Sequence, residues 1–352
     1  MTGPHAVRQR LEEREESLSP FAARSRLSRR ARPEPPCPLR TAFQQDRDRI
    51  LYSKAFRRLK HKTQVFINPE GDHYMTRLTH TLEVAQTART ISRALKLNED
   101  LAEAIALGHD LGHTPFGHVG EEVLDQLVPG GFRHSEQSLR VVDFMEKQGQ
   151  GLNLTAEVRE GILNHSKGKE GFDPQGPQTL EGQVVKLADA IAYINHDTSD
   201  ALRAGLLTPQ DLPAQVTAIL GQTPSERVNT LITDAVEFSW SATGEEGTEP
   251  VIGLSPQVRE AAEALREFLF RRVYFQLSRL EEAQAARRVV RALYSFLLQH
   301  PERVAPYPAG ETVERRVVDY LAGMTDHFAQ KLAQEVAWPA GQNLAPGRGV
   351  SR

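Results

Sequence analysis

The sequence predicts an all-α fold, and three observations carry that prediction. Apolar residues recur at helical spacing through most of the chain. Extended runs with period-two alternation are almost absent. Helix boundary signals also occur where the periodicity changes, such as Gly112 after one apolar run and Ser255-Pro256 before another. We therefore expect a helical bundle with additional C-terminal helices rather than an α/β sheet.

The expected helices follow one another along the chain, each marked by its apolar period. Ile50, Phe56 and Leu59 mark the first, and the third ends near Gly112. A Gly- and Pro-containing stretch over residues 241–257 is the clearest internal loop. We expect helices over residues 46–66, 78–95, 99–110, 120–127, 135–147, 154–164, 180–206, 258–277, 280–300 and 311–336.

Composition divides the chain into four parts. Residues 1–45 form an Arg/Pro-rich arm that has too few large apolar residues to order by itself, although it can order against a partner subunit. We expect the core domain over residues 46–210. Residues 211–338 are expected to complete the fold and to supply an oligomer interface. Residues 339–352 read as a flexible tail.

Length, charge and cysteine content exclude several classes of protein. The 352 residues carry a formal net charge of -3, which argues against a surface built throughout to grip nucleic acid. The single cysteine, Cys37, excludes a disulfide framework and a multi-cysteine zinc site. No apolar run approaches the roughly 18 residues of a membrane span. We expect a cytoplasmic protein without membrane contact.

Histidines are concentrated in one part of the chain, and an acidic residue adjoins one of them. Nine of the twelve lie between His61 and His196. His109-Asp110 ends an apolar helix, and neighbouring helical side chains point about 100° apart, so both reach one ion only at the helix end. With His80 upstream and Asp189 downstream they form a set of two nitrogen and two oxygen ligands, which suits a divalent cation.

These four residues follow the H…HD…D order of the HD superfamily of metal-dependent phosphohydrolases, which the sequence resembles. The closer resemblance is to the deoxyguanosinetriphosphate triphosphohydrolase-like family, over residues 43–329. It rests on the blocks FQQDRDRILYSKAFRRLKHKTQVF (43–66), TRLTHTLEVAQTAR (76–89), GHDLGHTPFGHVGEE (108–122), FRHSEQSLR (132–140), LADAIAYINHDTSDA (187–201) and DYLAGMTDHFA (319–329).

The resemblance implies cleavage of a deoxynucleoside triphosphate at the α-phosphorus, with Mg²⁺ or Mn²⁺ as the cofactor. His118 and Glu121, three apart at a helix start, share a face and suit an acid/base pair. Whether His118 protonates the leaving oxygen or helps to activate water stays open. His113 and His134 match positions that line the family's site, although some members carry Asn in place of His113.

The expected substrate contacts come partly from spacing and partly from the resemblance. Asp189, Tyr193 and Asp197 are four apart and therefore share one helix face. The resemblance implies that Tyr193 and Asp197 contact the sugar and leave no room for a 2′-hydroxyl. Two further candidates are phosphate contacts: Arg57 from a basic run and Lys167 from a Lys-rich loop. The last candidate is Gln64, which is expected to read the base or sugar edge.

Two other functions remain open at this stage. One is an HD phosphohydrolase that acts on another nucleotide, such as a monophosphate or a signalling nucleotide. The other is a non-catalytic nucleotide- or DNA-binding regulator, because the Arg-rich arm suits weak, salt-dependent contact with nucleic acid. The resemblance further implies a homo-oligomer, often a hexamer, and in some members activation by a second nucleotide. Base preference and the working metal are left undetermined.

Overall fold

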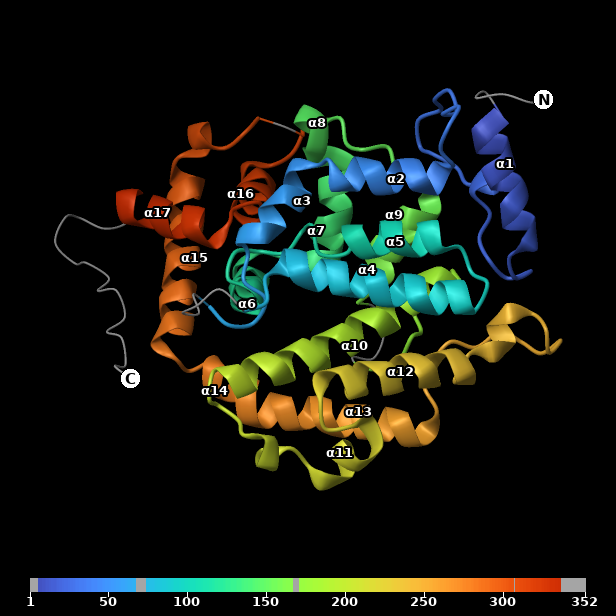
Figure 1. Cartoon of the computed structure of the whole chain (residues 1–352). Coiled ribbons are helices and arrows are strands. Elements are labelled where there is room, and N and C mark those ends of the chain that lie inside the picture. Colours follow the sequence, from blue (N-terminus) through green and yellow to red (C-terminus); the bar gives the residue numbers. More distant parts are fainter. Residues whose placement is uncertain (1–5, 68–73, 167–170, 307, 337–352) are drawn as a thin grey trace.

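The chain is described by a computed structural model over residues 6–67, 74–166, 171–306 and 308–336 (Figure 1). Within these residues the secondary structure is helical, and the only β-type pairings are isolated bridges between Arg30 and Thr155 and between Thr63 and Thr76. The predicted all-α class is confirmed. Among the described helices, none has both the length and the hydropathy that crossing a bilayer requires.

The first half of the chain contains the helices that surround the histidine cluster. They are α1 (Val7–Arg14), α2 (Ala42–Leu51), α3 (Lys54–Arg58), α4 (Arg77–Ala94), α5 (Glu99–Gly108), α6 (Gly117–Leu127), α7 (His134–Arg140), α8 (Glu146–Gly149), α9 (Ala156–Asn164) and α10 (Leu180–Arg203). The second half contains α11 (Ala214–Leu220), α12 (Pro224–Phe238), α13 (Pro256–Leu269), α14 (Phe275–Leu277), α15 (Glu281–Gln299), α16 (Val313–Ala322) and α17 (Asp326–Val336).

The larger hydrophobic core is centred on α4, which lies between α5 and α10, while α2 covers the other side of α5 (Figure 1). α4 begins at Thr76, whose side chain accepts a hydrogen bond from the Thr79 amide as an N-cap. Its buried face includes Val84, Ala88 and Ile91, spaced at the three- and four-residue intervals of a helix. Of these helices, α4, α5 and α10 fix the backbone positions of the metal-ligand candidates.

A second hydrophobic cluster joins α6 to α15, α16 and α17. Val123 and Leu124 of α6 meet Val290 and Leu293 of α15, and all four are fully buried. Phe116, in the turn before α6, also belongs to this cluster. The C-terminal helices therefore pack directly behind the segment that connects α5 to α6.

The N-terminal arm is ordered against the body of its own chain. The buried Glu15 carboxylate accepts hydrogen bonds from the Ser25 amide at 2.8 Å and from Asn98 Nδ2 at 3.1 Å. Ser19 Oγ donates to the Ala242 carbonyl at 2.6 Å. These contacts with the rest of the chain order the arm, whose composition alone does not favour an ordered structure.

Helix breaks that periodicity does not reveal account for the differences from the expected elements. The helix predicted over 46–66 ends at Leu51, because Ser53 caps a new helix by accepting from the Phe56 amide at 3.1 Å. The helix predicted over 311–336 is two helices, separated at Gly323. The 135–147 segment passes from α7 into a π-helical turn at Val141–Met145. α11 and α12 occupy a region for which we predicted no helix.

Candidate active site

Three segments bring the four predicted metal ligands to one place. His80 projects from α4 and Asp189 from α10, while His109 and Asp110 follow the last residue of α5. His80 Nε2 lies 3.1 Å from Asp189 Oδ1 and 3.9 Å from Asp110 Oδ2. His109 Nε2 lies 3.5 Å from Asp110 Oδ1 and 3.9 Å from Asp189 Oδ1. The ligand atoms of His80, His109 and Asp110 therefore lie within 4.8 Å of one another, and Asp189 adjoins the two histidines.

The turn after α5 is held by close packing against α7. Ser138 Oγ accepts from the Gly112 amide at 2.9 Å and donates to the His109 carbonyl at 2.6 Å. A Cβ at Gly112 would lie 2.1 Å from the Ser138 amide nitrogen, so only glycine allows the two backbones to approach this closely. This contact fixes the backbone directions of His109 and Asp110.

The protonation of this cluster suits a divalent cation. His109 Nδ1 lies 2.6 Å from the Ala106 carbonyl, which only accepts, so the ring proton is on Nδ1 and Nε2 carries a free lone pair. That Nε2 is buried and has no hydrogen-bond partner. Burial raises the pKa of Asp110, but His109 and Arg77 outweigh it and hold the pKa well below its usual value. Burial likewise raises the pKa of Asp189, but hydrogen bonding to His80 and the charge of His109 outweigh it and hold that pKa well below its usual value. Two imidazole nitrogens and two ionised carboxylates are suitable donors for such an ion.

Arg77, which the sequence analysis did not single out, lies beside the metal-ligand cluster. It is 1% exposed, and its Nη1 donates to Asp110 Oδ2 at 2.7 Å. Its Nε and Nη2 are buried without a partner. The one available signal was its position three residues before His80, which places both side chains on the same face of α4. A buried guanidinium with unpaired N–H groups is a ready anion contact.

A second cluster adjoins the first and contains the predicted acid/base residues. Glu121 of α6 accepts from the His134 amide at 2.8 Å and lies 2.9 Å from His134 Nδ1. His118 Nδ1 lies 3.4 Å from Glu121, and His113 Nε2 lies 3.8 Å from it. The closest partner of Glu121 is therefore His134, although the spacing pointed to His118. His118 has a 55% exposed side chain.

The charges in this cluster are set by burial and by Glu121. Burial lowers the pKa of His134, but the Glu121 carboxylate outweighs it and holds that pKa above its usual value. Burial together with Arg77 and His134 holds the pKa of His113 well below its usual value. The pKa of Glu121 is depressed because the surrounding histidines outweigh its burial. Neighbouring imidazoles are thus biased toward different protonation states.

The turn that carries His113 and leads to α6 has a constrained backbone. Phe116 has a φ of 62° and Gly117 a φ of 57°, both in the left-handed region. Lys62 Nζ donates to the His113 carbonyl at 2.5 Å and to the Ala322 carbonyl at 2.8 Å. Asp326, the first residue of α17, accepts from the Phe116 amide at 2.9 Å. The C-terminal helices therefore hold the turn in place.

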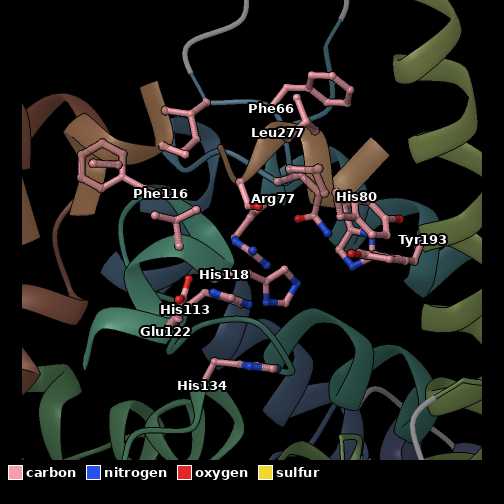
Figure 2. Close-up of a pocket in the computed structure, with 18 of the residues that line it drawn as sticks. Phe66, Arg77, His80, His113, Phe116, His118, Glu122, His134, Tyr193 and Leu277 are labelled. Carbon is pink, nitrogen blue, oxygen red and sulfur yellow. The ribbon is translucent and has the colours of Figure 1, made fainter. Parts of the chain in front are cut away.

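Both clusters open into a cavity of about 1210 Å³ (Figure 2). In the close-up, Arg77, His113 and His118 converge near the centre, with His80 and Tyr193 to one side. Gln64 and Tyr193, two of the predicted substrate contacts, line the cavity. Asp197 is 1% exposed and does not line the cavity, although Tyr274, to which it is hydrogen-bonded, does. Arg57 is exposed and lies outside the lining. Lys167 lies outside the described residues.

Two further lining residues come from tertiary packing and carry no motif of their own. His165 lies behind the ligands, with its ring 5.1 Å from that of His109 and its Nε2 3.1 Å from His134 Nε2. Burial lowers its pKa to about 3, so it is neutral near pH 7. Tyr274 follows α13 and packs against Tyr193 with ring centroids 5.7 Å apart. The histidine count drew attention to His165, but nothing in the local sequence indicated Tyr274.

Comparison with known families supports this view of the fold and site. An HD domain model matches residues 77–194, the segment that contains all four ligand candidates. A phosphohydrolase-associated domain model matches residues 252–335, which include the helices behind the active-site turn. Fold and site together therefore define a hydrolase of the HD-domain, metal-dependent phosphohydrolase class.

Curated relatives narrow this class. A deoxyguanosinetriphosphate triphosphohydrolase-like protein from Caldanaerobacter subterraneus subsp. tengcongensis is 54% identical over 92% of this chain and 93% of its own length. One from Desulfatibacillum aliphaticivorans is 47% identical over 95% of this chain and 98% of its own length. The chain therefore belongs to the deoxyguanosinetriphosphate triphosphohydrolase-like family.

A solved structure also overlaps with the chain. The crystal structure of a hypothetical protein from Aquifex aeolicus aligns with a TM-score of 0.46 at 18% identity and covers 82% of this chain and 67% of its own. That overlap is too loose to bear on function.

Proposed function

We propose that the protein hydrolyses deoxynucleoside triphosphates at the α-phosphorus and releases a deoxynucleoside and inorganic triphosphate. The observation that carries the proposal is the convergence of His80, His109, Asp110 and Asp189 beside the cavity, which all of them but His109 line. The lone pair of His109 Nε2 is buried and unused. A divalent cation, Mg²⁺ or Mn²⁺, held there supplies Lewis acidity toward the phosphate and toward water.

Binding of the triphosphate is assigned to the cationic groups beside the metal-ligand cluster. A triphosphate carries about four negative charges and needs several donors. Arg77 is anchored to Asp110 by one nitrogen and has its Nε and Nη2 unpaired. His134 adds a second positive group, because Glu121 favours its charged form. These groups neutralise and orient the phosphates without using the ligand atoms of the metal site.

Proton transfer is assigned to His118, with Glu121 as its partner. His118 is the most exposed imidazole of its cluster and lines the cavity, so its ring can reach a bound phosphate ester. Glu121 lies 3.4 Å from His118 Nδ1, close enough to orient the ring. His113 and His134, whose rings stack with centroids 4.3 Å apart, line the cavity beside this pair. His118 and Glu121 can therefore assist proton transfer when the bond between phosphorus and the 5′ oxygen is cleaved, as the proposed reaction requires.

Preference for deoxyribose is assigned to the two tyrosines. Tyr193 and Tyr274 present adjoining rings to the cavity. Tyr274 Oη donates to the buried Asp197 Oδ2 at 2.5 Å, which fixes the phenol with its hydrogen bond already made. A 2′-hydroxyl placed against these rings would lose its water partners and gain none, and such a site discriminates against it.

Product analysis tests the proposal directly. The full chain is incubated with each of the four dNTPs and with Mg²⁺ or Mn²⁺ in water enriched in ¹⁸O, and the products are separated by anion exchange and weighed by mass spectrometry. We expect deoxynucleoside and triphosphate, with the ¹⁸O in the triphosphate, because water attacks phosphorus. Monophosphate with pyrophosphate, or ¹⁸O in the nucleoside, would contradict the proposed bond cleavage. His109→Ala serves as the inactive control.

The same assay, run also with deoxynucleoside monophosphates as substrates, separates the two alternative functions. Orthophosphate from a deoxynucleoside monophosphate would favour an HD phosphohydrolase of another specificity. Nucleotide binding without turnover under either metal would favour a regulator. The pairing of Glu121 with neighbouring imidazoles supports catalysis, because binding alone does not require an acid/base pair. A homo-oligomer remains our prediction for the assembly.

A further inference from the structure

A buried polar path leads away from the metal-ligand cluster behind His80. His80 Nδ1 lies 2.9 Å from Nε2 of His196, and the two rings meet edge-on with centroids 5.0 Å apart. His196 Nδ1 lies 2.8 Å from Asp197 Oδ1. Asp197 Oδ2 in turn accepts from Tyr274 Oη. His80, His196 and Asp197 are 1%, 3% and 1% exposed, so the path is shielded from bulk solvent.

The two histidine ligands differ in what holds their tautomer. His109 Nδ1 faces the Ala106 carbonyl, which accepts only and therefore requires a proton on Nδ1. The Nδ1 of His80 faces another imidazole nitrogen, which either donates or accepts. The tautomer of His80 therefore depends on where His196 carries its own proton. This dependence makes His196 more than a packing residue.

Only one distribution of protons along the path leaves His80 able to bind a cation. Its Nε2 must be bare, so the ring proton is on Nδ1 and points at His196 Nε2. Two N–H groups cannot face each other at 2.9 Å, so His196 Nε2 must also be bare and its proton is on Nδ1. That proton faces the Asp197 carboxylate, which favours it by charge, although the contact is bent away from an ideal hydrogen bond.

The opposite tautomer would close the site. If His196 donated from Nε2, His80 would carry its own proton on Nε2. That N–H would point at Asp189 Oδ1, 3.1 Å away, and would occupy two ligand atoms in a hydrogen bond to each other. The position of the proton on His196, beside Asp197, therefore decides between two arrangements of the ligands. Either His80 Nε2 and Asp189 Oδ1 are free to bind a cation, or they are hydrogen-bonded to each other.

We propose that His196 is a positioning residue which, with Asp197, holds His80 in the tautomer and orientation whose Nε2 faces the metal. This inference rests on the proposed function only for the presence of a divalent cation at the site. Hydrogen bonds of this kind to metal-bound histidines typically change metal affinity by about 10- to 100-fold when removed. His196 does not line the cavity, so its effect on substrate passes through the metal site.

Metal binding by the full chain, without substrate, tests the proposal. The metal-stripped protein is titrated with Mn²⁺ and followed by electron paramagnetic resonance and calorimetry. We expect His196→Leu, which removes the acceptor, to raise the Mn²⁺ dissociation constant by about 10- to 100-fold. His196→Gln places an amide oxygen near the former Nε2 and an N–H₂ toward Asp197, so it should stay within about threefold of wild type. Equal affinities for wild type and His196→Leu would overturn the proposal.

A matched variant and a spectroscopic measurement keep the test decisive. Val184→Ala lies on the same helix at a fully buried position away from the path, and it shows how far general destabilisation alone lowers metal affinity. In ¹⁵N-histidine-labelled wild type loaded with diamagnetic Zn²⁺, His80 and His196 should both carry protons on Nδ1. A proton on His196 Nε2 would overturn the proposal even if the leucine variant failed to fold. A wild-type chain that bound no Mn²⁺ would contradict both this inference and the proposed function.

Discussion

At the scale of single residues, carboxylates that serve more than one partner organise the site. Glu121 accepts from the His134 backbone and contacts three imidazoles, and Asp110 accepts from Arg77 while facing the histidine ligands. In each case the carboxylate remains charged in spite of burial, because the surrounding cations and imidazoles outweigh it. Changing one of these groups should therefore alter several others at once.

Replacing Glu121 by Gln tests the acid/base cluster. The amide keeps the shape of the side chain but removes the negative charge that lies beside His118 and His134. We expect kcat to fall by about 10²- to 10⁴-fold, the range typical for loss of acid/base assistance. Glu136→Gln is the matched control, because Glu136 is an exposed residue of α7 that does not line the cavity, and its kcat should change by less than about twofold. Equal losses in both variants would contradict the assignment.

The Glu121–His134 pair also predicts a pH dependence of stability. The folded-state pKa of His134 is raised, so its stabilisation is fully present below the unfolded pKa of about 6.5 and is lost as pH rises through the folded-state value. The pKa of Glu121 is depressed, so that carboxylate stays charged across this window. We expect the difference in Tm between metal-free wild type and His134→Gln to shrink from pH 6 to pH 9. A difference that grew with pH would have the wrong sign.

At the scale of elements, the sequence predicted the helices that carry motifs better than the breaks between helices. The ranges for α4, α5 and α9 agree with the structure within two residues, because each has a clear apolar face. The break at Ser53 depends on a single cap, which an apolar period does not register. The motif also indicated the four metal-ligand candidates. Tyr274 reaches the site only through packing between distant segments, which local sequence does not encode. Arg77 shares a face of α4 with His80, but no motif marked it.

The turn before α6 makes a prediction at this scale. A Cβ at Gly117 would lie 2.8 Å from the Gln64 carbonyl oxygen, and its φ of 57° is unfavourable for other residues. Gly130 also has a positive φ, of 90°, but nothing lies within 4 Å of its Cβ position. Gly117→Ala should therefore lower the free energy of unfolding by at least about 1 kcal/mol more than Gly130→Ala.

Urea denaturation of both variants measures this difference. Because the turn also carries His113 and leads into the helix that bears His118, Gly117→Ala should reduce kcat, whereas Gly130→Ala should leave it near the wild-type value. Indistinguishable unfolding midpoints for the two alanine variants would show that the contact with Gln64 is not a constraint.

At the scale of the whole molecule, the site lies where two hydrophobic clusters meet. α4, α5 and α10 supply the metal-ligand candidates, and α15 to α17 hold the active-site turn from behind (Figure 1). Asp326 connects the two parts by accepting from the Phe116 amide and from the Thr63 amide at 3.0 Å. The phosphohydrolase-associated region therefore acts as structural support for the HD domain.

Asp326→Ala tests this support. It leaves the buried amide of Phe116 and the partly buried amide of Thr63 without an acceptor. This should cost about 1–3 kcal/mol of unfolding free energy and reduce activity through the displaced turn. Glu302→Ala, at an exposed position in the same C-terminal region, should change stability by less than about 0.5 kcal/mol. Full activity in a clearly destabilised Asp326→Ala variant would show that the function of the turn does not depend on its contact with the C-terminal helices.

The most direct test of the whole account is anomalous diffraction from crystals of the protein loaded with Mn²⁺. We expect one strong peak within about 2.5 Å of His80 Nε2, His109 Nε2 and one carboxylate oxygen each of Asp110 and Asp189. A peak elsewhere in the chain, or a fully loaded crystal in which any of these four side chains pointed away from the ion, would contradict it.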